Sequence, residues 1–316
     1  MSVYLDHQAT SPMPQAVKEA YLEAMNIAGN PSALHRGGRA ARALMEDARE
    51  RIATMVGAHP VEVVFTSGGT EAINTALKGS VWAHQREHGA EAPTAIASTL
   101  AEHHATLDAI TWLHEQEATA WSEIAVDDTG VMDLESLDQV LGERKITVVS
   151  SLVANNEVGS IQPVKEIVDI SSAHGVPVHV DAVAALGYQR LNFRDMGVES
   201  MSLSAHKVGG PVGVGALVLS RYALDIQALH HGGNQQRSRS GTMDAAGAVA
   251  FAVALEVRAA VREEGEHRLV ALRDRLRAGL LNVAPQCVAR GSLDHRLPGN
   301  LHLTVPGCKG DVLLYL

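Results

Sequence analysis

Lys207 stands in a part of the sequence that suits contact with a flat ring. It follows a short β-prone run and precedes the segment Gly209 to Gly215, in which four of the seven residues are glycine. Because glycine has no side chain, a planar molecule can lie close to the backbone there. A surface lysine in a flexible hairpin is the alternative, and Lys207 alone does not decide between the two.

Asp181 is a second candidate, because it ends an apolar run, Val176 to Val180, that is typical of a buried strand. A carboxylate beside a pyridine nitrogen keeps that nitrogen protonated, and the ring then acts as an electron sink. The alternative is an aspartate that forms a turn or caps a helix, which is common at strand ends.

The segment Thr66 to Glu71 joins a predicted strand to a predicted helix. Its glycines, Gly68 and Gly69, allow a sharp turn, and the first amides of the helix attract phosphate. Thr70 can add a hydroxyl donor. The same residues also suit an ordinary helix start, with Thr70 as the cap and Glu71 near the positive end of the helix dipole. The two interpretations are compatible.

Two further polar side chains follow predicted strands. His103 opens a helix within AEHH, and histidine is the side chain that most readily exchanges protons near neutral pH, so it could stack on a ring and transfer protons. Asn155 lies within NNEVG and could hydrogen-bond to a ring oxygen or a substrate. A structural histidine and a turn asparagine are the alternatives.

The elements that would position these residues alternate between short apolar runs and helical patterns. Strands are predicted over residues 61–66, 94–98, 146–152, 176–180, 200–204 and 214–219, the last one reversed. Helices are predicted over residues 38–56, 163–174 and 244–281, and also from Thr70 and after His103. This alternation predicts an α/β fold, with a mainly parallel sheet covered by helices on both faces. Such folds bind ligands at the carboxyl ends of their strands, where the polar candidates lie.

Composition and charge argue against several classes of function. The 316 residues carry a formal net charge of −10, which does not suit a nucleic-acid or anionic-membrane surface. The first residues show no secretory signal, and the longest apolar run, Ala245 to Leu255, is too short to span a bilayer. Two cysteines make no disulfide framework, so a reducing, cytoplasmic location is expected. The histidines have no zinc-like spacing, and no metal site is expected.

The chain is long enough for two domains. We predict a large cofactor-binding domain over residues 13–250 and a smaller α+β domain from residues 1–12 and 251–316. Within the smaller domain, residues 300–305 should form a strand and residues 310–316 should open an amphipathic helix.

Taken in order, the motifs resemble those of a known family. They are YLDHQAT, NPSALH, TSGGTEAIN, AEHH, NNEVG, HVDA, SAHKVGGPVGVGAL and RSGT. Together they cover the chain from Tyr4 onward in the order and spacing of class V aminotransferases. Within that group the match is to cysteine desulfurases of the iron–sulfur cluster assembly type. The resemblance implies an aminotransferase-like fold of type I, whose large domain contains a seven-stranded sheet.

The resemblance also implies roles for single residues around pyridoxal phosphate. Lys207 would hold the cofactor as a Schiff base, Asp181 would pair with the pyridine nitrogen, and His103 would stack on the ring as an acid/base group. Asn155 would lie near the ring and the substrate. Thr242 would reach the phosphate of a neighbouring subunit, which implies a homodimer. Further contacts to the phosphate would come from Gly69, Thr70, Ser204 and His206.

The implied reaction converts L-cysteine to L-alanine. A loop thiolate would take the substrate sulfur as a persulfide and deliver it to an iron–sulfur scaffold or a sulfur-carrier protein. Two alternatives stay open. One is another enzyme of the same fold, such as a selenocysteine lyase, a cysteine lyase or an aminotransferase. The other is a cofactor-binding protein without desulfurase activity.

Three departures from the family pattern bear on these expectations. Many members have a glutamine bonded to the ring oxygen three residues after the aspartate, where this chain has Ala184. The loop Gly232 to Thr242 is about one residue shorter than usual. The family's nucleophilic cysteine lies beyond the end of this chain, and neither Cys287 nor Cys308 matches it. We therefore expect the 316-residue chain to be incomplete, although Cys308, beside Lys309, could substitute for the missing thiol.

Overall fold

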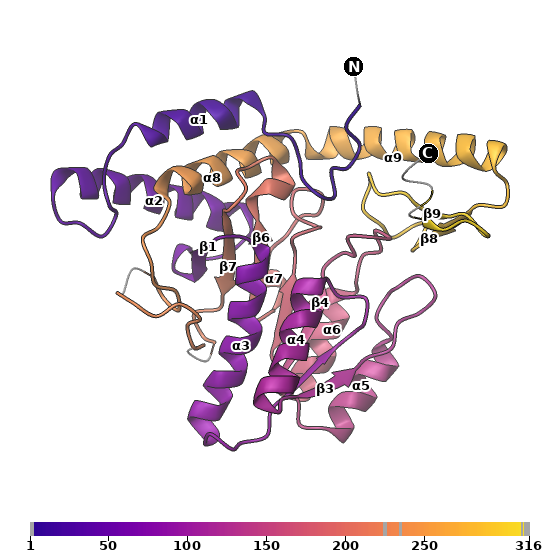
Figure 1. Cartoon of the computed structure of the whole chain (residues 1–316), viewed down its shortest axis with the longest axis horizontal. Helices are drawn as coiled ribbons and strands as arrows, with labels where there is room; N and C mark the ends of the chain where they lie inside the picture. The colour runs from indigo at the N-terminus through magenta and orange to yellow at the C-terminus, as the bar shows by residue number, and fades with distance from the viewer. Residues whose placement is uncertain (1–2, 224–225, 234–235, 311, 313–316) are drawn as a thin grey trace.

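The central element of the fold is a seven-stranded sheet (Figure 1). The computed structural model describes residues 3–223, 226–233, 236–310 and 312. The strand order is β1-β7-β6-β5-β4-β2-β3, and only the β7 pairings, to β1 and β6, are antiparallel. The predicted mainly parallel sheet with a reversed last strand is therefore confirmed. The strands are β1 (Val63–Thr66), β2 (Ala95–Ser98), β3 (Ala120–Glu123), β4 (Val148–Leu152), β5 (Val178–Asp181), β6 (Ser200–Ser204) and β7 (Gly215–Leu219).

Helices cover both faces of this sheet. In Figure 1, α3 and α4 cross in front of the strands, and α6 lies behind them. Two short 3₁₀ turns, η1 (Pro60–Glu62) and η2 (Ala205–Val208), flank strands, and β8 (Val288–Arg290) pairs with β9 (His302–Thr304) in a separate ribbon. The α-helices are α1 (Gln15–Met25), α2 (Arg36–Met55), α3 (Gly69–His88), α4 (His104–Glu117), α5 (Leu134–Glu143), α6 (Val164–Ala173), α7 (Phe193–Met196), α8 (Ala245–Ala260) and α9 (Arg262–Val283).

The strand side chains alternate between two hydrophobic layers, as the period of two in an extended chain requires. Ile96 and Val148 face α3 and α4, where they join a cluster that includes Ile110 and Leu113. Their neighbours Ala97 and Val149 belong to the larger core on the opposite face, which includes residues of α2, α6 and α8. Burial on both faces explains why strands such as β1 (VVFT) and β7 (GALVL) are mainly apolar along their length.

Several elements were not expected from the sequence. β3 lies at the edge of the sheet, and only one of its four residues is buried. Its sequence, AWSE, contains no apolar run, and for that reason the strand was not predicted. Helices α1 and α5 were also missed. The helix predicted over residues 244–281 is two helices that meet at Val261. The strand predicted over residues 300–305 is shorter, and most of the helix predicted over residues 310–316 lies outside the described residues.

The predicted domain boundary after residue 250 falls inside α8. Beyond that position, Ala254 and Leu255 are still buried in the main core, because α8 packs against α1 and α2. By contrast, α9 has no buried residues. At the other end of the chain, the N–H of Ser11 donates to the carbonyl of His206, which ties the first residues to the large domain. The division into two domains stays a prediction.

Candidate active site

Polar side chains from distant parts of the sequence meet in one cavity at the carboxyl ends of the central strands. The cavity has a volume of about 170 Å³. Seven of the nine predicted site residues line it, and the other two, Asn155 and Thr242, do not. The full lining is Gly69, Thr70, Ile73, His103, Leu152, Asn156, Asp181, Val183, Ala184, Ser204, His206 and Lys207.

Asp181 is the last residue of β5 and is only 3% exposed. Its Oδ1 accepts a hydrogen bond of 2.9 Å from the N–H of Val183. Burial raises the pKa of the Asp181 carboxyl, while that hydrogen bond and the nearby His103 and Lys207 act in the opposite direction. A buried carboxylate of this kind attracts a cationic group that enters the cavity.

Lys207 lies in η2, directly after β6, and is partly buried. Its Nζ donates to the carbonyl oxygen of Gln8, which brings the N-terminal segment over the cavity. Burial lowers the pKa of Lys207, against the opposing attraction of Asp181, Asp6 and Glu157. A lowered pKa increases the fraction of neutral amine, which is the nucleophilic form.

His103 is the N-cap of α4, and its ring is exposed to the cavity. Its Nδ1 accepts a hydrogen bond of 3.0 Å from the N–H of Ala105. Because Nδ1 acts as the acceptor, the proton of the neutral ring sits on Nε2. Nε2 is therefore the atom of His103 that can exchange a proton with a bound molecule.

The start of α3 lines one end of the cavity with Gly69 and Thr70. Its N-cap is Gly68, which has a φ of 151° and offers no side chain to the first amides of the helix. A Cβ atom at Gly69 would lie 2.7 Å from Cγ2 of Val183, so a larger residue there would require Val183 to shift. The uncapped amides suit a phosphate group. The alternative interpretation made Thr70 the cap of this helix. In the structure Thr70 instead lies exposed in the first turn.

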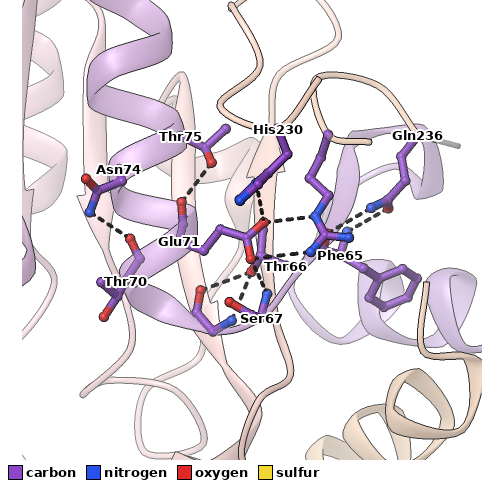
Figure 2. A network of polar contacts seen from close by, with 11 residues as sticks. Phe65, Thr66, Ser67, Thr70, Glu71, Asn74, Thr75, His230 and Gln236 are labelled. Atoms are coloured by element: carbon purple, nitrogen blue, oxygen red, sulfur yellow. Dashed lines mark hydrogen bonds and ion pairs between the residues drawn. The ribbon is translucent and has the colours of Figure 1, made fainter. Parts of the chain in front are cut away.

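Glu71 fixes this helix start to a distant loop (Figure 2). Its Oε2 accepts from the N–H of Ser67 at 2.7 Å, and its Oε1 accepts from Nε of Arg239 at 2.9 Å. Nδ1 of His230 lies 3.5 Å from the same Oε1. Burial alone would raise the pKa of Glu71, but the bonds from Arg239 and Ser67 outweigh burial and the pKa is lowered. The carboxylate thus holds the segment that carries Thr242.

Thr242 and Asn155 lie outside the lining of the cavity. Thr242 is exposed and lines a separate hollow with Ser67 and Arg239. The Asn155 side chain is occupied locally, since its Nδ2 donates to the carbonyl of Ala101 and its Oδ1 accepts the N–H groups of residues 157 and 158. The adjacent Asn156 lines the cavity in its place, and the pair NN gave no means of choosing between them.

The two cysteines lie apart from the cavity. Neither Cys287, which is partly buried, nor Cys308, which is exposed, lines the cavity. Among the described residues, no three histidine, cysteine or acidic side chains are grouped so as to hold a metal ion. In the same residues, no helix has both the length and the apolar character needed to cross a membrane.

Comparison with known proteins agrees with the fold. Residues 3–315 match the class-V aminotransferase family, and the chain belongs to that family. Within it, the IscS-like cysteine desulfurase of Mycobacterium tuberculosis is 43% identical over 317 residues, which cover 99% of this chain and 80% of the relative.

Two solved structures agree with this placement. A structure described as a NifS-like protein has a TM-score of 0.91 and 34% identity, with 100% of this chain and 85% of the other covered. A structure of SspA in complex with cysteine has a TM-score of 0.74 and 31% identity, with 81% of this chain and 72% of the other covered.

Members of this family use pyridoxal phosphate, and the cavity fits that cofactor. Lys207 would supply an amine for the aldehyde, and Asp181 would supply a buried carboxylate for the pyridine nitrogen. The uncapped start of α3, opened by Gly68 and Gly69, supplies amides for the phosphate. Ala184 lines the same cavity but has no polar atom for the ring oxygen, as the sequence indicated.

Proposed function

We propose that Lys207, Asp181 and His103 perform the chemistry of this protein, a pyridoxal-phosphate-dependent cysteine desulfurase that converts L-cysteine to L-alanine. The observation that supports these roles is the meeting of an amine, a buried carboxyl and an imidazole in one cavity. They come from η2, β5 and the start of α4, which are far apart in the sequence.

When bound, pyridoxal phosphate supplies an electron-accepting ring. Asp181 keeps the pyridine nitrogen protonated, and burial strengthens this pairing because little water screens it. Nζ of Lys207 takes a proton from the substrate α-carbon, a role that its lowered pKa favours. Nε2 of His103 is placed to give or take a second proton. In the overall reaction the Cβ–S bond of cysteine breaks, a thiol takes the sulfur as a persulfide, and a proton replaces sulfur on Cβ.

The sulfur leaves for a protein acceptor, which we propose to be an iron–sulfur scaffold or a sulfur carrier. We assign neither Cys287 nor Cys308 as the thiol that takes the sulfur first, because neither lines the cavity.

The direct test of the function is the release of alanine from L-cysteine. The purified protein should form alanine in the presence of pyridoxal phosphate, and Lys207→Ala should lose this activity by at least about a thousandfold. Lys165→Ala is a matched control, since Lys165 is exposed and paired with Asp169. Equal activity in Lys207→Ala and the wild type would contradict the role of Lys207.

We also propose that the active form is a homodimer in which Thr242 serves the cofactor site of the partner subunit. Its exposed position outside the chain's own cavity supports this, as does the Glu71–Arg239 pair that holds its loop. Co-expression of Lys207→Ala with Thr242→Ala chains should restore activity, because one site of each mixed dimer keeps both residues. A monomer by sedimentation, or no restoration, would contradict the shared site.

A further inference from the structure

Glu102 is a buried carboxyl group beside the active site that the proposed chemistry does not use. It is 7% exposed and does not line the cavity. Its Oε1 accepts a hydrogen bond of 2.9 Å from the N–H of Leu152, the last residue of β4. The neighbouring strand β2 pairs with β4 only as far as Ala97 and Val149. Glu102 therefore takes the place of a strand partner at the end of β4.

A second bond holds the same segment from its other side. Nδ2 of Asn155 donates to the carbonyl of Ala101 at 2.9 Å. Residues 101 and 102 are thus attached to the end of β4 and to the turn that follows it. His103 comes next in the chain, so these two bonds determine where its ring enters the cavity.

The second oxygen of Glu102 indicates which form of the group is present. Within the described residues, Oε2 of Glu102 and the hydroxyl oxygens of Thr106 and Ser150 are buried without hydrogen-bond partners. A carboxylic acid can donate its O–H to the oxygen of such a hydroxyl. A buried carboxylate would instead need a cation to offset its charge, and the groups that act on Glu102 include none.

The surrounding charges favour a proton on Glu102. The charged group that acts on Glu102 is Asp181, which is also an acid. Asp181 has His103, Lys207 and the N–H of Val183 to stabilise its negative charge. Leu152, Thr106 and Ser150 are hydrogen-bonding groups that stabilise a charged Glu102, but no cation acts on it, so of the two interacting carboxyls Glu102 is the one that holds the proton.

We propose that Glu102 is a positioning residue, whose protonated carboxyl group ties the His103 segment to β4 and leaves the negative charge of the pair on Asp181. Its value to the site is twofold. It fixes the segment that carries His103, and it adds no second negative charge beside Asp181. The part of this role that concerns the cofactor rests on the proposed functions of Asp181 and His103.

The protonation can be tested without cofactor. Burial, with a contribution from Asp181, raises the pKa of Glu102 to about 8, whereas the unfolded group titrates near 4.5. The folded state therefore holds a proton that the unfolded state releases, and its stability falls as pH rises from 4.5 towards 8.

Glu102→Gln removes this titration and keeps both the acceptor for Leu152 and a donor for the hydroxyls. Between pH 5 and pH 8, the Tm of the cofactor-free wild type should fall by about 5 °C relative to the Tm of the Glu102→Gln variant. Glu115→Gln, an exposed position on α4, is the matched control and should show no such difference. A Glu102→Gln difference that is constant over this range would overturn the protonated state.

The positioning role is tested by comparing two variants with cofactor. Glu102→Gln should retain pyridoxal phosphate and its visible absorbance as the wild type does. Glu102→Ala, which loses the bond to Leu152, should bind the cofactor about tenfold more weakly. If Glu102→Gln binds as weakly as Glu102→Ala, the group acts as a carboxylate and the proposal is wrong. The melting experiment does not depend on the cofactor, so the proposal and the proposed function can fail separately.

Discussion

The two faces of the central strands β4, β5 and β6 differ in character. The face towards α3 and α4 carries Ser150, His179, Asp181, Ser202 and other buried polar residues. The opposite face carries mainly apolar side chains that join the main core, among them Val149, Val180, Met201 and Leu203. One sheet thus serves two purposes: the apolar face contributes stability, and the polar face supports the cavity at its end.

The polar face is costly to bury, so its groups are paired. His179 lies between two hydroxyls, with Nδ1 2.8 Å from Oγ of Ser200 and Nε2 3.2 Å from Oγ of Ser202. Asp181 follows on the same face, two residues along β5. Hydrogen-bonded polar groups in this position hold the backbone beside the cavity in a single arrangement.

The largest expected effect of a substitution on the polar face is on activity. Asp181→Ala should reduce alanine release by about a thousandfold or more, because the pyridine nitrogen loses the carboxylate that keeps it protonated. The Tm of the cofactor-free protein should fall little, because the carboxyl group that the substitution removes is costly to bury. Turnover within tenfold of the wild type would contradict the role of Asp181.

The apolar face should respond in the opposite way. Leu203→Ala should lower the free energy of unfolding by about 3 kcal/mol, because Leu203 is 0% exposed and its removal leaves a cavity in the main core. The folded variant should still bind the cofactor, and urea unfolding with and without pyridoxal phosphate measures both effects. Loss of cofactor binding at unchanged stability would remove the distinction between the two faces.

A smaller effect should appear in the pH dependence of His179. Burial lowers the pKa of His179 to about 3, below the ordinary value of 6.5, so the unfolded chain takes up a proton that the folded chain does not. Stability is therefore lost as pH falls below 6.5. Relative to His179→Gln, the wild type should lose about 2 kcal/mol between pH 7.5 and pH 5, measured by urea unfolding. Parallel stability curves would show that His179 is charged or exposed in the folded protein.

The same contrast explains what could be predicted from the sequence. The sequence could bring Lys207 and Asp181 to one edge of the sheet because Asp181 ends β5, Lys207 follows β6, and the carboxyl ends of parallel strands meet. Glu102 was missed because a glutamate at a helix start is ordinarily a surface residue. Its burial depends on β2 ending before β4, which is a matter of strand lengths in three dimensions.

Local pattern was also insufficient for Asn155 and β3. Asn155 and Asn156 are identical side chains at adjacent positions, and only the turn decides which one lines the cavity. β3 forms because β2 provides a partner along its whole length, although its own residues are weakly apolar. Tertiary pairing overrides strand propensity in such cases.

The covalent attachment of the cofactor tests the central claim most directly. The protein should be loaded with pyridoxal phosphate, reduced with borohydride, digested, and mapped by mass spectrometry. The account predicts a single pyridoxyl label on Lys207, the amine that lies in the cavity with Asp181. A label on Lys145 or Lys165 instead, or the same labelling in Lys207→Ala, would contradict it.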